Sequence, residues 1–179
     1  IALRDKALWA RTMDELPAFL DRDGFAKYFA SEPLGSDTLT AYLLSIASEA
    51  GWEIPAGALA RMRGALHDFA AGRAGPDSPL HTADLTIRKV AALEALSRYQ
   101  PVEPNLLDSI EAAPNLWPTS AVLDWHSLMK RSDGLRDRDK HVTETEQILR
   151  SRLNFQGTTM GFSTERLDYL WWLMISADV

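Results

Sequence analysis

Hydrophobic residues recur along most of this chain at intervals of three and four positions, the spacing of one face of an α-helix. The pattern predicts helices over residues 2–20, 36–51 and 55–72, then from about residue 82, from 104 and from 118, over 135–153, and from 163 onward. No run of alternating residues is bounded by hairpin turns, so the sequence predicts no strand. The predicted fold class is all-α.

Residues that start and stop helices lie at the expected ends of these segments. Ser36 or Asp37 can accept the free amide protons in the first turn of the second helix, and Gly51 can end it. Pro55 and Pro104 are placed to open the third and fifth helices.

The predicted helices differ in how much of their circumference is apolar. Those starting near Ser36, Thr82, Thr119 and Ser163 are broadly apolar, and the main stripe of the first is Leu39, Tyr42, Leu43, Ile46 and Ala50. The helices between them carry one narrow stripe, such as Leu59, Met62, Leu66 and Phe69. A broadly apolar helix needs neighbours on most sides, whereas a helix with one stripe lies at a rim.

The alternation of the two helix types indicates a repeat of helix pairs, because the broad helices start about 40 residues apart. Inner and outer helices taken in turn predict a partial α/α toroid of about eight helices. We expect residues 1–179 to form a single domain that is a fragment of a larger multidomain protein. Ile1 is not an initiator methionine, and the last predicted helix is apolar to the chain end.

Composition narrows the function classes. The chain has 179 residues, 46% of them hydrophobic, and a net charge of −6, which disfavours nucleic acid as a partner. It contains no cysteine, so it can form neither a disulfide nor a cysteine-ligated metal site by itself. No run is long enough to span a bilayer.

Several residues are candidates for a functional site. The histidines at 67, 81, 126 and 141 lack the spacing of a zinc site, and the glycines near 157–161 lack that of a phosphate loop. Asp21, Asp23, Asp37 and Asp84 lie near predicted inner-helix starts, where a toroid glycosidase would hold its acid and base, but capping is the favoured interpretation. Trp171 and Trp172 could stack on a sugar, although core packing is favoured. We predict no catalytic, cofactor-binding or metal-binding residue, and no enzyme activity.

Three segments of the chain resemble a known family. DGFAKYFASEPLGSDTLTAYLLSIASEAGW (residues 23–52) resembles the DG-x-F and LTAY segment of thioester domains in the alpha-2-macroglobulin and complement family. NLWPTSAVLDWHSLM (115–129) is similar to a later inner helix of that domain, and QGTTMGFSTERLDYLWWLM (156–174) to its GGGFGSTQDT segment. The segments occur in the family's order, and the first and third resemble its bacterial branch.

The resemblance implies an α/α toroid and a scaffold role in a bacterial protease-trapping inhibitor. Members of the family cage a protease after it cuts a bait region, and many capture it through a Cys–Gln thioester that a large apolar interface keeps from water. The implied partners are trapped proteases, through the parent protein, and neighbouring domains of the same chain. The implied location is the periplasm, with membrane attachment only through a lipid anchor elsewhere in the parent.

The chain departs from the family pattern in one respect. The Cys-x-x-Gln motif would precede Ile1, so the sequence leaves open whether the parent forms a thioester. Some relatives transfer the acyl group through a histidine, and His81 lies only loosely in that region, so this role is not assigned to it. The alternatives are a carbohydrate-active enzyme on the same toroid and a helical-repeat interaction module.

Overall fold

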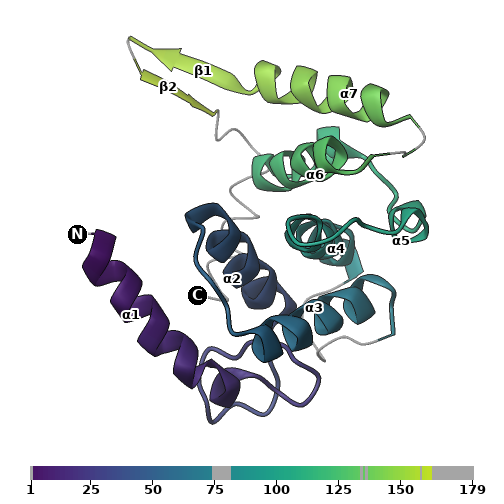
Figure 1. The fold of residues 1–179 in the computed structure, drawn as a ribbon. Helices are drawn as coiled ribbons and strands as arrows, with labels where there is room; N and C mark the ends of the chain where they lie inside the picture. The colour runs from purple at the N-terminus through teal and green to yellow at the C-terminus, as the bar shows by residue number, and fades with distance from the viewer. Residues whose placement is uncertain (1, 74–81, 134, 136, 158, 163–179) are drawn as a thin grey trace. The chain divides into compact units, whose positions relative to one another are not determined.

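The computed structural model describes residues 2–73, 82–133, 135, 137–157 and 159–162 (Figure 1). Within these ranges the chain is mostly helical, which confirms the all-α character apart from one short hairpin. The predicted helix from Ser163, His81 and the Trp171–Trp172 pair lie outside the described residues.

The chain divides into two compact units, residues 1–110 and 111–179, which are described separately. The elements of the first unit are α1 (Ala2–Glu15), the short 3-10 helix η1 (Leu16–Phe19), α2 (Asp37–Ala50), α3 (Ala56–Ala70), α4 (Thr82–Ser97) and α5 (Pro104–Asp108). Those of the second are the 3-10 helix η2 (Pro114–Leu116), α6 (Thr119–Arg131), α7 (Arg138–Ser151), β1 (Leu153–Gln156) and β2 (Thr159–Phe162).

The core of the first unit lies where α4 packs against both α2 and α3 (Figure 1). The central turns of α4 are buried on several sides, as its broad apolar surface predicts. The buried side chains of α4 include Val90, Ala92, Leu93, Ala95 and Leu96. On α3 the predicted stripe is largely confirmed, since Met62, Leu66 and Phe69 are buried.

Helices α2 and α4 run parallel to each other. Helix α3, which connects them along the chain, runs antiparallel to both. Asp37 at the start of α2 binds Arg88 in the first half of α4, while Glu49 near the end of α2 binds Arg98 just after α4. Arg88 also lies over the ring of Phe69, near the end of α3, at 5.2 Å from its centroid. Helix α3 thus connects the two parallel helices and packs against both of them.

The buried face of α2 is not the predicted stripe. The buried residues of α2 include the small side chains of Thr40, Ala41 and Ala47, together with Leu44, which the sequence places beside the stripe. Tyr42 is 61% exposed and Ala50 is exposed, so the prediction of the stripe is wrong at these positions. Small side chains let two helix backbones approach closely, and a stripe chosen by side-chain size overlooks them.

The first helix ends earlier than the sequence predicted. The α-helix stops at Glu15 and the chain continues as η1, with Pro17 in its first turn. Proline has no amide hydrogen and its ring would clash with the carbonyl four residues back, so the helix cannot continue through it. Trp9 of α1 donates a hydrogen bond from Nε1 to the carbonyl of Glu53 at 2.8 Å and stacks obliquely on Trp52.

In the second unit α6 and α7 pack antiparallel and are tied at both ends. Arg138 at the start of α7 donates to the carbonyl of Met129 near the end of α6 at 3.0 Å. Arg152 just after α7 donates to the Thr119 hydroxyl at the start of α6 at 3.1 Å. Between them lie Val122, Trp125 and Leu128 of α6, all buried.

The prediction that the chain contains no strand is wrong for residues 153–162. Strands β1 and β2 pair antiparallel, with Leu153 opposite Phe162 and Phe155 opposite Met160 (Figure 1). Gly157 opens the connecting turn with φ of 62°, the left-handed conformation that tight hairpin turns require. Each strand has only four residues, which is too short for alternation alone to distinguish it from a helix end.

Candidate functional site

The carboxylate of Asp21 joins several backbone segments of the first unit. Its Oδ1 accepts hydrogen bonds from the backbone amides of Asp23, Gly24 and Phe25 at 3.0, 2.8 and 2.9 Å. Its Oδ2 accepts one from the amide of Gly35 at 2.8 Å. Four charge-assisted bonds occupy a buried carboxylate fully and join the two ends of the loop over residues 21–35. We call this arrangement the Asp21 clamp.

The clamp is fixed to the helices on either side. Thr40 of α2 accepts a hydrogen bond from the amide of Ala26 at 2.8 Å and donates to the carbonyl of Ser36 at 2.6 Å. Arg61 of α3 donates to the carbonyl of Asp21. Gly24 has φ of 102°, and a Cβ there would lie 2.5 Å from the carbonyl oxygen of Arg61, so a side chain does not fit.

Between the clamped ends, the loop holds apolar side chains out to solvent. Tyr28 is 48% exposed, Phe29 67% and Leu34 44%. The Glu32 carboxylate accepts from the amides of Tyr28 and Phe29 at 3.1 and 3.2 Å, which fixes the backbone at the tip. An ordered loop that exposes aromatic groups is suited to contact another protein, because little conformational entropy is lost on binding.

The other candidate carboxylates are divided between structural and exposed positions. Asp37, which is 4% exposed, receives a bidentate pair from Arg88 at 2.6 and 2.8 Å. Asp23 is exposed beside Arg22 at 3.4 Å, and the side chain of Asp84 lies outside those described. Of the candidate carboxylates in the described part of the chain, Asp21 and Asp37 are buried, and both already bind other groups of the protein. The amide at the first turn of α2 is capped by Ser36, whose hydroxyl accepts from Leu39 at 3.2 Å, as predicted.

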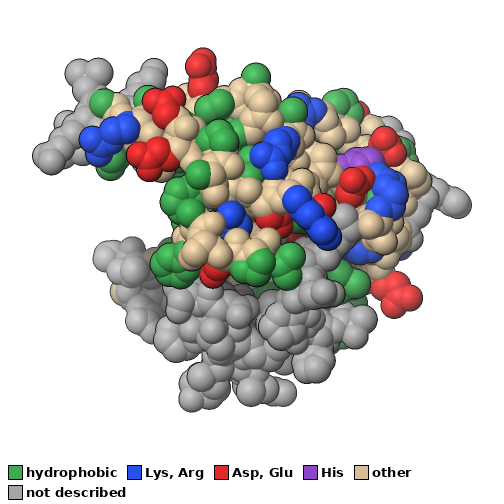
Figure 2. Space-filling model, turned by 90° about the horizontal axis from the view of Figure 1, so that it is seen from below, with side chains coloured by type: hydrophobic (Ala, Val, Ile, Leu, Met, Phe, Trp, Pro, Cys, Tyr) green, Lys and Arg blue, Asp and Glu red, His purple; other side chains and the backbone are tan. Residues whose placement is uncertain are grey.

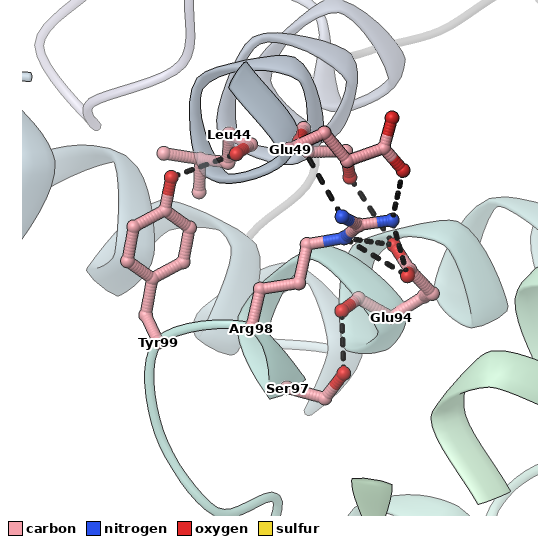
Figure 3. Close-up of polar contacts among 7 residues, drawn as sticks. Leu44, Glu49, Glu94, Ser97, Arg98 and Tyr99 are labelled. Carbon is pink, nitrogen blue, oxygen red and sulfur yellow. Dashed lines mark hydrogen bonds and ion pairs between the residues drawn. The ribbon is translucent and has the colours of Figure 1, made fainter. Parts of the chain in front are cut away.

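A buried charge network between α2 and α4 is not among the predicted sites (Figure 3). Glu94 of α4 is 2% exposed, and both its carboxylate oxygens accept from Nε of Arg98, at 2.9 and 3.0 Å. Ser45 of α2 donates to Glu94 at 3.1 Å, and Arg98 reaches the exposed Glu49 at 2.9 Å. The sequence feature that could have predicted this network is Glu94, a charged residue within the apolar run VAALEAL.

The network shifts the acidity of its members. Burial alone would lower the pKa of Arg98, but the hydrogen bonds and charges of Glu94 and Glu49 raise it above the usual range. Burial raises the pKa of Tyr99, against the opposing charges of Arg98 and Arg63, and its hydroxyl donates to the carbonyl of Leu44 at 2.7 Å. Arg98 and Tyr99 therefore keep their ordinary protonation at neutral pH, and their hydrogen bonds join α4 and the residues after it to α2.

The described histidines are dispersed. His126 of α6 shares a 2.9 Å hydrogen bond between Nδ1 and the hydroxyl of Thr145 on α7, and burial together with Lys130 lowers its pKa, against the charge of Glu146. His141 stands edge-on to Trp125. His67 lies 3.5 Å from Asp68, whose pKa is lowered first by the hydrogen bond from Arg73. No group of three or more His, Asp or Glu residues that could hold a metal ion occurs in the described ranges.

The surface shows charges of both signs. On the face drawn in Figure 2, acidic and basic side chains of the described residues are interspersed with hydrophobic ones, with no large area of a single sign. Among the helices described, none is long and apolar enough to cross a membrane.

Comparison of the chain with models of known protein families, with curated proteins and with solved structures gives no match.

Proposed function

We propose that this chain is a scaffold part of the thioester domain of a bacterial alpha-2-macroglobulin-like protease-trapping inhibitor. In that role it shields or presents the reactive segment of the parent protein and docks on neighbouring domains of the same chain. Its protein partners are then the trapped proteases, and its location is the periplasm.

The observation that carries the proposal is the structural use of the residues that resemble the family. Within residues 23–52, Thr40 of the LTAY sequence accepts a hydrogen bond from the amide of Ala26, the residue after DGF. The carboxylate of Asp21, two residues before the segment, holds the amides of Gly24 and Phe25. Local contacts that agree with the global fold favour a single native structure, so the resembling segment has a structural use in this chain.

A partial α/α toroid is the architecture that accompanies this proposal. The parallel pair α2 and α4, joined through the antiparallel α3, supports it, because a toroid repeats this step with parallel inner helices. The buried central turns of α4 fit an inner helix, and the one-sided stripe of α3 fits an outer one.

A carbohydrate-active enzyme on the same fold is less well supported. Such an enzyme needs an acid and a base that face the substrate, whereas Asp21 and Asp37 are occupied by backbone amides and by Arg88.

The proposal is tested with the full-length polypeptide that contains these residues. It is mixed with trypsin, and the cleavage of a large protein substrate is compared with that of a small chromogenic peptide. We expect the inhibitor to abolish cleavage of the protein while most peptide cleavage is kept, because a caged protease still admits small molecules. Equal cleavage of both substrates, or equal loss of both, would contradict a trap.

A further inference from the structure

The β1–β2 hairpin has one apolar face that the described residues leave uncovered. Directly paired residues point to the same side of an antiparallel ladder, so Leu153, Phe155, Met160 and Phe162 share one face. Phe155 is 68% exposed, Met160 61% and Phe162 43%. The opposite face carries Asn154 and Gly161. The hairpin is thus amphipathic.

A hairpin of this size needs further packing to persist. Two strands alone are marginally stable in water, and stability comes with a third strand or with a helix against the apolar face. Within the described ranges the sheet has two strands. We therefore expect another segment to cover the apolar face of the hairpin.

The size of the face favours an occupant on the same chain. With about 200 Å² for each large side chain, the three exposed residues offer about 350 Å². A stable complex of separate proteins buries about 800 Å² on each partner, more than twice this area. A tethered segment needs less contact, because its effective concentration reaches about millimolar values.

We propose that the apolar face of the hairpin is the docking surface for residues 167–175 of the same chain. This segment follows β2 after residues 163–166 and contains Leu167, Leu170, Leu173 and Ile175, with Trp171 and Trp172 between them. The sequence predicts it to be helical, and a helix of this length spans about 13 Å. A strand of four residues also spans about 13 Å, so the two elements match in length. The proposal does not depend on the protease-trap function.

The absence of native cysteine allows a direct test by disulfide cross-linking in the 179-residue chain. Met160→Cys is combined in turn with cysteine at each of Leu170, Trp171, Trp172 and Leu173, four consecutive positions that sample every side of a helix. The matched control is Asn154→Cys with the same four partners, since Asn154 is exposed on the other face. After mild oxidation by copper–phenanthroline, linked peptides are quantified by mass spectrometry.

We expect one or two of the four partners to link within the chain to position 160, at yields about tenfold above those from position 154. Equal yields from both positions, no link from either, or links only between two chains would overturn the proposal. The last result would assign the face to a second copy.

A second measurement requires no cysteine. Phe155→Asp places one charge on the apolar face, and Asn154→Asp places one on the opposite face. We expect hydrogen exchange in residues 167–175 to become about tenfold faster in the first variant and to stay unchanged in the second. Equal exchange in the two variants would contradict docking.

Discussion

Single carboxylates fix the backbone of this protein where it is not helical. Asp21 lies at the start of a loop of 15 residues, counted from Asp21 to Gly35, and satisfies four amides that regular structure would otherwise satisfy. Because the carboxylate is buried, it and not bulk water satisfies these amides. The stability of this loop therefore depends largely on one side chain.

We expect Asp21→Ala to lower the free energy of unfolding by about 3 kcal/mol, because three buried amides and one part-buried amide lose their acceptor. Asp23→Ala, two residues away and exposed, should change it by less than about 0.5 kcal/mol. Urea unfolding followed by circular dichroism measures both. A loss at Asp21 no larger than that at Asp23 would show that other groups hold the loop.

Between elements, ion pairs join helices whose contact surfaces are otherwise apolar. Arg98 has two carboxylate partners in very different surroundings: Glu94 is 2% exposed, and the side chain of Glu49 is 68% exposed. Both carboxylates are within hydrogen-bond distance of Arg98, so distance alone would predict equal contributions to the free energy of unfolding. Because Glu94 is buried and Glu49 is exposed, we expect Glu94 to contribute more.

We expect Glu94→Ala to lower the free energy of unfolding by about 3–5 kcal/mol, because it leaves the Arg98 charge largely buried without its main partner. Glu49→Ala should cost less than about 1 kcal/mol, since an exposed pair is screened by solvent. Equilibrium unfolding in urea compares the two variants. Similar losses would mean that Arg98 is solvated in the folded protein.

The contact between α6 and α7 should depend on pH through His126. Its pKa in the folded protein lies below the unfolded value of about 6.5, chiefly through burial. As the pH falls through about 6.5, the unfolded chain binds a proton that the folded chain resists, so the free energy of unfolding decreases, and above this pH it is level. His126→Asn, which cannot titrate but keeps an amide near Thr145, should show a smaller decrease between pH 7 and 5.

Two measurements test the assignment to His126. NMR titration of the His126 ring should give a pKa below 6.5, and Lys130→Gln should raise it, because the Lys130 charge contributes to the shift. If the wild-type chain and His126→Asn lose stability equally with falling pH, another group is responsible.

Much of the helical structure could be predicted from local signals, and the exceptions have identifiable causes. The starts at Ser36 and Pro104 were predictable because capping and proline chemistry act within one turn. The buried face of α2 was not, because Thr40, Ala41 and Ala47 are small and carry little hydrophobic signal beside Tyr42. At the candidate site, Asp21 was predicted to act as a cap. Its bond to Gly35 joins positions 14 apart, which no periodicity encodes.

At the scale of the whole molecule, the contacts that hold the first unit together lie within residues 1–110. The Asp21 clamp, the Asp37–Arg88 pair and the Glu94–Arg98 network all join elements of that range. Its core around α4 is formed by α2 and α3. We therefore expect residues 1–110 to fold independently.

A polypeptide of residues 1–110 should be helical and unfold in one cooperative transition, because a core of this size supports two-state behaviour. Circular dichroism with thermal melting measures this, and Glu94→Ala in the same polypeptide should lower its melting temperature markedly. A spectrum without helix, or a melt without a transition, would mean that residues beyond 110 are needed.

The Asp21 clamp has a consequence for how this protein tolerates change. Because the carboxylate joins Gly24 and Phe25 to Gly35, the ends of the loop stay together whatever residues lie between them. Lengthening a closed loop costs little, since each doubling adds about 0.6 kcal/mol. Residues 28–34 are thus the place where insertions can accumulate during evolution, and where a foreign peptide could be displayed, while α2 and α3 remain undisturbed.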